Sequence, residues 1–408
     1  MILNVADYLS VQSAFDAAVD GDSVYFPAIA PWIAPPQGWA VSKSLEIYGD
    51  GPGDLANGLG TILKPATTPS GGVQPTGDVL ILTPARSRLE NVTVKDLTIV
   101  GQGNAPRYGI RFSPGTSQLS GLRLERLIIS GMGTAGISLI GNNVQGQDVV
   151  SVFMSRVEVL DCAGVGVDLL AAFQVYMDRC TLARNGKGGS YPQWANPILG
   201  ASQLNGYQSQ VAMYFCELDG TGAIGAGGSG LAPPPLSLQA GTLARVDTCR
   251  FLGFASAGRA VRFADPGIIA CIGASDFELS SYASAALGIE VPATAQGFPS
   301  MILILPNRFA GLGKAVAIAS GARMVTVFPQ AYIPVSGSQP PTIDLPAFAN
   351  DAPFALPSLA NPSGNSVAGL LLPSYTSDPP TSLPSGTLYY NAGLRVLVDG
   401  QWKVAQTS

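Results

Sequence analysis

The stretch VYMDRCTL, residues 175–182, holds the pattern that decides the fold of this chain of 408 residues. An acid, a base and a thiol stand side by side in it: Asp178, Arg179 and Cys180. Such a trio can be a reactive centre with charged helpers, or it can be one unit of a repeat. The two interpretations differ in what the rest of the sequence must contain, because only a repeat has to recur.

The pattern does recur, at a spacing of roughly 30 residues, which is typical of repeat proteins. Eight segments share its alternation of apolar and polar residues. They are VTVKDLTI (92–99), LRLERLII (122–129), VFMSRVEV (152–159), VYMDRCTL (175–182), VAMYFCEL (211–218), ARVDTCRF (244–251), ACIGASDF (270–277) and ILILPNRF (302–309). VYMDRCTL is therefore one unit of a repetitive body.

Each segment is predicted to form two short strands joined by a bend. When its residues are numbered 1 to 8, positions 1 and 3 are apolar, and so are positions 6 and 8 in most segments. Inward-facing residues alternate along a strand, and the alternation changes phase between positions 3 and 6. The bend must therefore lie at position 4 or 5.

A third strand follows in most repeats. A small residue and a short apolar alternation come after the segment, as in GIRF (109–112), GISL (136–139), GVDL (166–169), AVRF (260–263), GIEV (288–291) and AVAI (315–318). One such unit cannot bury its apolar side alone, whereas stacked neighbours can. The chain is thus predicted to be all-β, a parallel β-helix of three sheets with its insertions in the turns.

Both ends of the chain differ from the repeats. The stretch SVQSAFDAAVDGDSVYFP (10–27) predicts a helical cap that starts at Ser10 and ends at Gly21. The apolar face of this helix consists of Val11, Ala14, Phe15, Ala18 and Val19. We expect four regions: the cap and first coils (1–66), the β-helix body (67–330), an extended Pro/Ser/Gly-rich arm (331–386) and a small C-terminal β-hairpin module (387–408).

The composition excludes several classes of function. There is no His, which excludes Ser-His-Asp and Cys-His activation of a nucleophile as well as His-ligated metals. The formal net charge is −5, and without a basic patch it gives no support to nucleic-acid binding. No apolar run is long enough to predict a membrane span. We expect neither a metal nor another cofactor.

The five Cys residues are expected to be free thiols. Cys180, Cys216 and Cys249 all occupy position 6, on three consecutive repeats. They are predicted to stack as a buried ladder, because a free Cys behaves as a small apolar side chain. Stacked Cβ vectors run parallel, which disfavours disulfides and the converging geometry that a metal needs.

Position 7 offers the best catalytic carboxylates. Its residues are Thr98, Ile128, Glu158, Thr181, Glu217, Arg250, Asp276 and Arg308. Glu158 and Glu217 should lie two coils apart, at about 9.6 Å, which touches the range of inverting glycosidases. Asp168 is near them in sequence. Alternating charges in one column are also what stabilisation of a surface by ion pairs produces, and we favour this ion ladder over a hydrolytic pair.

Three aromatic residues are candidates for glycan binding. Tyr191, Trp194 and Tyr207 lie in the largest insertion, residues 183–210. Exposed aromatic side chains on the flank of a β-helix can stack on sugar rings. The alternative is that they seal the side of the helix or a contact between protomers.

Three stretches resemble the pectate-lyase-like right-handed parallel β-helices, and among these the phage tailspikes. They are SVQSAFDAAVDGDSVYFP (10–27), SLEIYGDGPG (44–53) and NVTVKDLTI (91–99). The resemblance covers roughly residues 8–320. It implies a right-handed helix with three parallel sheets, a homotrimer, and a place on the exposed surface of a virion. The chain departs from the superfamily's enzymes, because it has no paired Asp motif, no His and no acidic cluster like that of the calcium-dependent lyases.

The sequence therefore predicts a structural or adhesive spike or fibre protein of a phage or phage-like particle, in contact with other virion proteins and a bacterial surface polysaccharide. The alternative is a polysaccharide depolymerase, a glycoside hydrolase or lyase on the same scaffold, with Glu158, Glu217 or Asp168 as acid and base. A third possibility is an architectural part of the particle without a ligand. The fold alone does not decide among them.

Overall fold

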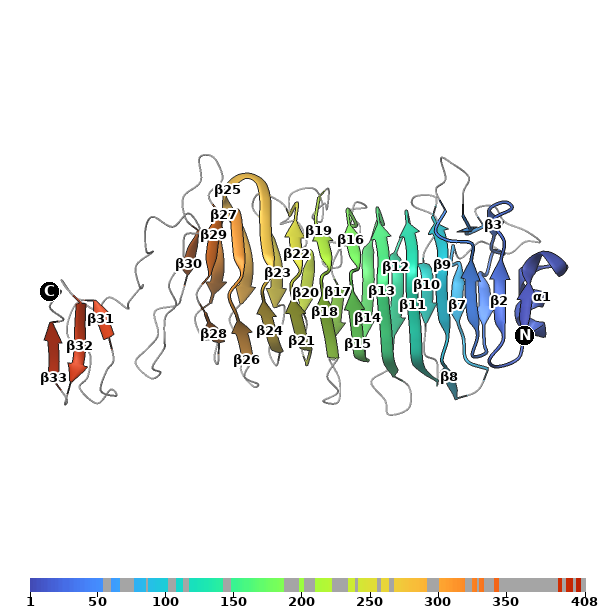
Figure 1. Ribbon diagram of the computed structural model, residues 1–408, viewed down its shortest axis with the longest axis horizontal. Helices are drawn as coiled ribbons and strands as arrows, with labels where there is room; N and C mark the ends of the chain where they lie inside the picture. Colours follow the sequence, from blue (N-terminus) through green and yellow to red (C-terminus); the bar gives the residue numbers. More distant parts are fainter. Residues whose placement is uncertain are drawn as a thin grey trace.

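The computed structural model describes residues 1–53, 60–66, 77–85, 87–101, 108–112, 117–141, 148–186, 198–201, 210–221, 234–238, 241–254, 258–263, 268–291, 301–319, 325–328, 330–333, 341–344, 388–390, 394–398 and 401–404. The predicted parallel β-helix is confirmed (Figure 1). Its coils stack from the helix α1 (Val11–Ala17) towards the strand β30 (Thr342–Asp344). Within the described part of the chain, no helix is long and apolar enough to cross a membrane.

Positions 1–4 of the repeats build what we call the first sheet, in which every neighbouring pair is parallel. Its strands are β1 (Ile2–Asn4), β2 (Ser23–Phe26), β5 (Glu46–Gly49), β9 (Thr93–Val100), β11 (Gln118–Ser130), β13 (Val149–Leu160), β15 (Ala172–Asp178), β18 (Gln210–Tyr214), β21 (Leu243–Asp247), β24 (Ile269–Gly273), β26 (Met301–Ile304) and β28 (Val325–Val327). The short strand β8 (Arg88–Glu90) pairs with the start of β11.

Positions 6–8 build the second sheet, and the strands after them build the third. The second sheet contains the later halves of β9, β11 and β13, with β3 (Trp32–Ile33), β6 (Ile62–Lys64), β16 (Thr181–Ala183), β19 (Glu217–Asp219), β22 (Arg250–Leu252), the starts of β25 (Asp276–Val291) and β27 (Arg308–Ile318), and β29 (Ala331–Ile333). The third contains β4 (Trp39–Val41), β7 (Leu80–Leu82), β10 (Tyr108–Phe112), β12 (Ala135–Ile140), β14 (Val165–Leu170), β17 (Ile198–Ala201), β20 (Leu236–Leu238), β23 (Arg259–Phe263), the ends of β25 and β27, and β30.

The bend between the first two sheets lies at position 5, where the backbone enters the left-handed region. The residues there have φ between 49° and 56° and are Asp96, Arg126, Arg156, Arg179, Phe215, Thr248 and Ala274. A non-glycine residue adopts this conformation at a cost of roughly 1–2 kcal/mol, so its recurrence on successive coils means that the stacking on both sides outweighs the strain. The bend confirms the predicted change of phase.

The register shows one further repeat that the sequence reasoning did not include. VTVFPQAY (325–332) continues the pattern, since Val325 pairs with Ile302 and Ala331 pairs with Arg308. The parallel ladder also passes residue 330, where the extended arm was expected to begin, because β29 and β30 both pair with β27. Most of the expected arm, residues 345–386, lies outside the described residues.

The core is a set of apolar ladders along the axis of the helix. Position 8 is buried throughout, and its rings Phe251, Phe277 and Phe309 stack with centroids 4.7 Å apart. Position 6 holds the predicted cysteine ladder, in which Cys180, Cys216 and Cys249 are all buried. One coil spacing therefore brings like side chains into van der Waals contact along the whole stack.

The same inner column turns polar after Cys249. Ser275 Oγ accepts from the backbone N–H of Cys249, and Asn307 Oδ1 accepts from that of Ser275. Gln330 Oε1 in turn accepts from the backbone N–H of Asn307. Each side chain thus satisfies the buried amide of the coil before it, which is what makes polar residues tolerable inside the solenoid.

The N-terminal cap forms as expected, with one correction. Ser10 caps α1 in a capping box with Ser13, and Val11, Ala14, Phe15 and Ala18 are buried. Val19 does not belong to the apolar face: the helix ends at Ala17, and the side chain of Val19 is 62% exposed. Lys43 Nζ donates to the carbonyls of Phe15, Asp16 and Ala18, which satisfies the C-terminal end of the helix.

At the other end of the chain, β31 (Leu388–Tyr390), β32 (Leu394–Val398) and β33 (Gln401–Val404) form a small antiparallel sheet.

Candidate functional site

The predicted carboxylates Glu158 and Glu217 lie in one outer column of the second sheet. Glu158 pairs in register with Thr181, which pairs with Glu217. The two side chains are therefore two coils apart, as expected, with the hydroxyl of Thr181 between them. Glu158 is exposed and Glu217 is half-buried.

From Glu217 onward this column is an ion ladder. Arg250 Nη1 lies 3.0 Å from Glu217 Oε2, and its Nη2 lies 3.6 Å from Glu278 Oε2. Between the two coils that follow, Arg308 Nη2 lies 2.5 Å from Asp276 Oδ2. The favoured interpretation of position 7 is thus confirmed for these residues. Glu158 differs: within the described residues it has no hydrogen bond or ion pair.

Asp168 lies on a different sheet, so the structure does not bring it together with the other two carboxylates. It pairs in register with Ser138 on β12, and Ser138 pairs in turn with Arg111 on β10. Burial raises the pKa of the Asp168 carboxyl to about 6. Ser138 is fully buried, and its Oγ has no hydrogen-bond partner in the described structure. A carboxyl group that titrates near neutrality can serve as a general acid.

The aromatic candidates Tyr191, Trp194 and Tyr207 all fall outside the described residues. The described coils carry another aromatic group, on the outer face of the first sheet. Phe153 and Tyr176 are register partners whose rings stack 5.3 Å apart at 9°. The ring of Tyr214 lies 5.3 Å from that of Tyr176 and is tilted against it by 32°. The sequence contained the signal for this group, because Phe153 and Tyr176 hold position 2 and Tyr214 holds position 4, both of which face outward.

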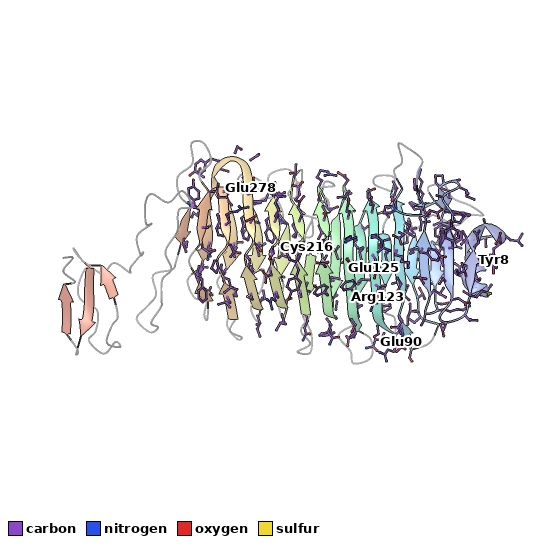
Figure 2. The ribbon with its side chains drawn as sticks, in the orientation of Figure 1. Tyr8, Glu90, Arg123, Glu125, Cys216 and Glu278 are labelled. Carbon is purple, nitrogen blue, oxygen red and sulfur yellow. The ribbon has the colours of Figure 1, made fainter. Side chains whose placement is uncertain are left out.

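An arginine stands at each end of this group. Arg123 lies over the ring of Phe153 at 6.0 Å, and Arg245 lies over the ring of Tyr214 at 5.6 Å. We call Arg123, Phe153, Tyr176, Tyr214 and Arg245 the aromatic strip; Figure 2 labels Arg123 at its end on β11. Tyr176 in the centre is 38% exposed.

The cysteines offer no reactive centre. All five are free, as predicted, and burial raises the pKa of the Cys162 thiol to about 12. Cys216 Sγ donates to the carbonyl of Tyr214 at 3.3 Å, inside the solenoid. Cys180 and Cys249 are buried as well, so that these four thiols cannot be reached by a substrate in the folded protein. Burial also raises the pKa of the fifth thiol, Cys271, which disfavours the reactive thiolate. Among the described residues there is also no group of three or more His, Cys, Asp or Glu side chains that could hold a metal ion.

Comparison with known proteins gives likeness in structure only. No protein-family model and no curated protein matches the sequence. Among solved structures, the ORF18 protein of Geobacillus virus E2 is similar with a TM-score of 0.57 and 13% identity, over 100% of this chain and 86% of that chain. The A-module of the mannuronan C-5 epimerase AlgE6 from Azotobacter vinelandii is similar with a TM-score of 0.54 and 12% identity, over 88% and 99% of the two chains.

A phage tailspike also appears among the similar structures. The tailspike of the Acinetobacter baumannii bacteriophage Fri1, a capsular polysaccharide depolymerase, has a TM-score of 0.47 and 12% identity, over 80% of this chain and 60% of that chain. At these identities the first two likenesses establish the fold alone, which is the parallel β-helix that the sequence predicts. The function has to be argued from the outer faces of this chain.

Proposed function

We propose that the protein is a spike or fibre component of a phage or phage-like particle, and that it contacts a bacterial surface polysaccharide. The observation that carries the proposal is the fold match over the whole chain with a protein of a virus, the ORF18 protein. The match with a module of an enzyme named for its action on mannuronan supports a polysaccharide as the contact. A long, rigid stack of coils suits a part that projects from a surface.

We favour adhesion over catalysis. Glu217 and Asp276 are held in ion pairs by Arg250 and Arg308, so that their carboxylates are already engaged by the protein. Glu158, without a partner among the described residues, stands two coils from Glu217 and on another sheet than Asp168. Adhesion needs no such acid and base, because several copies in one particle raise the avidity of weak sites.

A homotrimer on the exposed surface of the virion belongs to the same proposal. The small antiparallel sheet of β31–β33 has too few residues to bury a core of its own, and association of three copies would supply the missing contacts. Sedimentation equilibrium of the purified chain measures the mass of the assembly. Labelling of intact particles with an antibody against the β-helix, viewed by electron microscopy, tests its location.

The second candidate function is a polysaccharide depolymerase, and Asp168 is the observation that favours it. Its carboxyl has a pKa of about 6 and lies beside the buried Ser138. A reducing-end assay on capsule and lipopolysaccharide from candidate hosts separates the two functions. Binding without new reducing ends supports the adhesive protein. Release of saccharide that is abolished by Asp168→Asn or Glu217→Gln, with Asp276→Asn as the matched control on the ion ladder, supports the enzyme.

A further inference from the structure

The aromatic strip forms one continuous outer surface across consecutive coils. Arg123, Phe153, Tyr176, Ala212 and Arg245 are successive register partners on β11, β13, β15, β18 and β21. Because Ala212 is small, the ring of Tyr176 reaches diagonally to Tyr214, two residues further along the same strand as Ala212. The strip therefore runs parallel to the axis of the β-helix.

Part of the apolar surface of the rings is open to solvent. The ring planes of Phe153 and Tyr176 are 9° apart, so each ring turns one face towards its neighbour. Tyr176 in the centre of the strip nevertheless keeps 38% of its surface exposed. A pyranose ring placed along the strip can pack its C–H groups against this exposed aromatic surface.

Polar groups that have no protein partner surround the rings. Arg123 makes no ion pair within the described residues, and neither does the carboxylate of Asp178, which is the register partner of Tyr214. The hydroxyls of Tyr176 and Tyr214 likewise have no hydrogen bond there. Donors and acceptors at fixed spacing beside an apolar surface are what recognition of sugar hydroxyls needs.

A second group on the same sheet shows the contrast. The ring centroids of Tyr25 and Tyr48 also lie close, 5.2 Å apart, and Lys95 lies over the ring of Tyr48. There the polar groups are engaged by the protein itself: the Tyr25 hydroxyl donates to Asp50, and Lys95 pairs with Glu46. This group holds the first coils together. In the strip, Arg245 pairs with Asp247, whereas the side chains of Arg123 and Asp178 and the two tyrosine hydroxyls have no ion pair or hydrogen bond among the described residues.

We propose that the aromatic strip binds an oligosaccharide segment of a bacterial surface glycan, which lies along the axis of the β-helix over β13, β15 and β18. The inference rests on the proposed function and assigns the contact to described residues. A glycan is favoured over a second copy of the chain. Acidic residues are depleted at the centre of a protein interface, whereas Asp178 lies beside the strip as the register partner of Tyr214.

The experiment begins with an array of purified capsular and O-antigen polysaccharides, probed with the full chain. Fragments of any polysaccharide that binds are then titrated by calorimetry against Tyr176→Ala and Arg123→Ala, with Tyr48→Ala as the matched control. We expect Tyr176→Ala to raise the Kd about tenfold through loss of the aromatic contact. Arg123→Ala should also raise the Kd, and for an acidic glycan this increase should become smaller as salt is added. Tyr48→Ala should leave the Kd unchanged.

The other outcomes overturn the inference in distinguishable ways. A polysaccharide bound equally by the wild type, Tyr176→Ala and Arg123→Ala would leave the proposed function standing and remove the strip as its site. No binding to any polysaccharide would remove both. A change in the mass of the assembly in Tyr176→Ala, measured by sedimentation, would make the strip a contact between protomers. Circular dichroism verifies the fold of each variant, and Arg123→Ala, which only removes an exposed side chain, keeps the test valid if Tyr176→Ala does not fold.

Discussion

Two neighbouring columns of the second sheet have the same coil spacing and opposite environments. The outer column at position 7 runs through Glu217, Arg250, Asp276 and Arg308, and its ion pairs span 2.5–3.0 Å. The inner column at position 8 is one residue away on the same strands, and its rings Phe251, Phe277 and Phe309 stack 4.7 Å apart. Both columns repeat one contact along the axis, but only the inner one removes its side chains from water.

The comparison shows which column contributes most of the free energy that stabilises the stack of coils. Burial of apolar surface stabilises the folded state by about 25 cal/mol per Å². In the inner column, Phe277 stacks on two rings, and Phe251 and Phe309 each stack on one. An exposed ion pair gains little, because water screens the charges and two long side chains lose freedom. The outer column therefore tolerates change and is where a binding function can be placed, whereas the inner column specifies the fold.

The largest effect is expected from Phe277→Ala, in the middle of the inner column. The substitution removes a fully buried ring that stacks on Phe251 and Phe309. It should lower the free energy of unfolding by about 3–5 kcal/mol, from lost burial and the cavity left behind. Denaturation in guanidinium chloride, followed by circular dichroism, measures it. The control Asp276→Ala changes the adjacent residue in the outer column, and an equal loss in both variants would contradict the comparison.

Asp168 is expected to have the next largest effect, because it faces outward and its carboxyl is nevertheless partly buried. Its pKa is about 6 in the folded protein against 3.8 for the ordinary carboxyl. The folded state thus holds more protons than the unfolded state between these values, and stability falls as the pH rises through this interval. At 1.36 kcal/mol for each pH unit, the cost of ionisation reaches up to about 3 kcal/mol above pH 6.

The substitution Asp168→Asn removes this ionisation. The variant should match the wild type near pH 4 and gain stability relative to it as the pH rises towards 7. Denaturant midpoints of both proteins, measured across this range, give the difference curve. A flat curve would mean that the carboxyl of Asp168 is solvated in the folded protein.

Asn185 should have a smaller effect, as a polar residue that faces the interior. It is fully buried, its Oδ1 accepts from the backbone N–H of Cys162, and its Nδ2 donates to the carbonyl of Val159. In Asn185→Ala these two backbone groups lose their partner, which should cost about 1–3 kcal/mol. Thermal unfolding measures this loss of stability. Asn185→Asp keeps the acceptor but places a carboxyl oxygen against the carbonyl of Val159 in a buried site, so it should not recover the loss.

The inner columns could be predicted from the sequence, because burial imposes the strongest pattern on residue types. Alternation along VYMDRCTL and its repeats gave the strands, the bend and the cysteine ladder. The repeat 325–332 was not recognised in the sequence, although its position 6 is polar as in the two repeats before it. Gln330 accepts there from the backbone N–H of Asn307. The end of the helix α1 was placed too late because the apolar Val19 fits the helical pattern, but it lies beyond the C-cap.

The outer surfaces were harder to predict, because their partners come from other coils at positions that spacing alone does not fix. The ion pairs of Arg250 and Arg308 join residues of a single column, position 7, and could therefore be predicted from the sequence. The contact between the rings of Tyr176 and Tyr214 joins two columns, positions 2 and 4, and depends on the small Ala212, which is the register partner of Tyr176. The burial of Asp168 could not be inferred either, since alternation places it outward. Asp168, Glu158 and Glu217 were close in sequence order, but the coil separates them onto two sheets.

Arg250→Ala is expected to have the smallest effect, and it tests the other half of the comparison. Arg250 is about half exposed and contacts Glu217 and Glu278. Its loss should lower the free energy of unfolding by about 0.2–1 kcal/mol at low ionic strength. Because mobile ions screen exposed charges, the difference from the wild type should vanish in 1 M salt, where the Debye length is about 3 Å.

Denaturation of the wild type and Arg250→Ala at low and high salt measures both values. Glu217→Gln serves as a second variant, since it removes the same contact from the other side and leaves Arg250 with Glu278. It should therefore cost no more than Arg250→Ala. A loss above about 2 kcal/mol that persists in high salt would show that the ladder acts as a desolvated ion network. In that case the outer column would specify the stacking of the coils as strongly as the phenylalanine column does, and it could not be altered freely to accommodate a ligand.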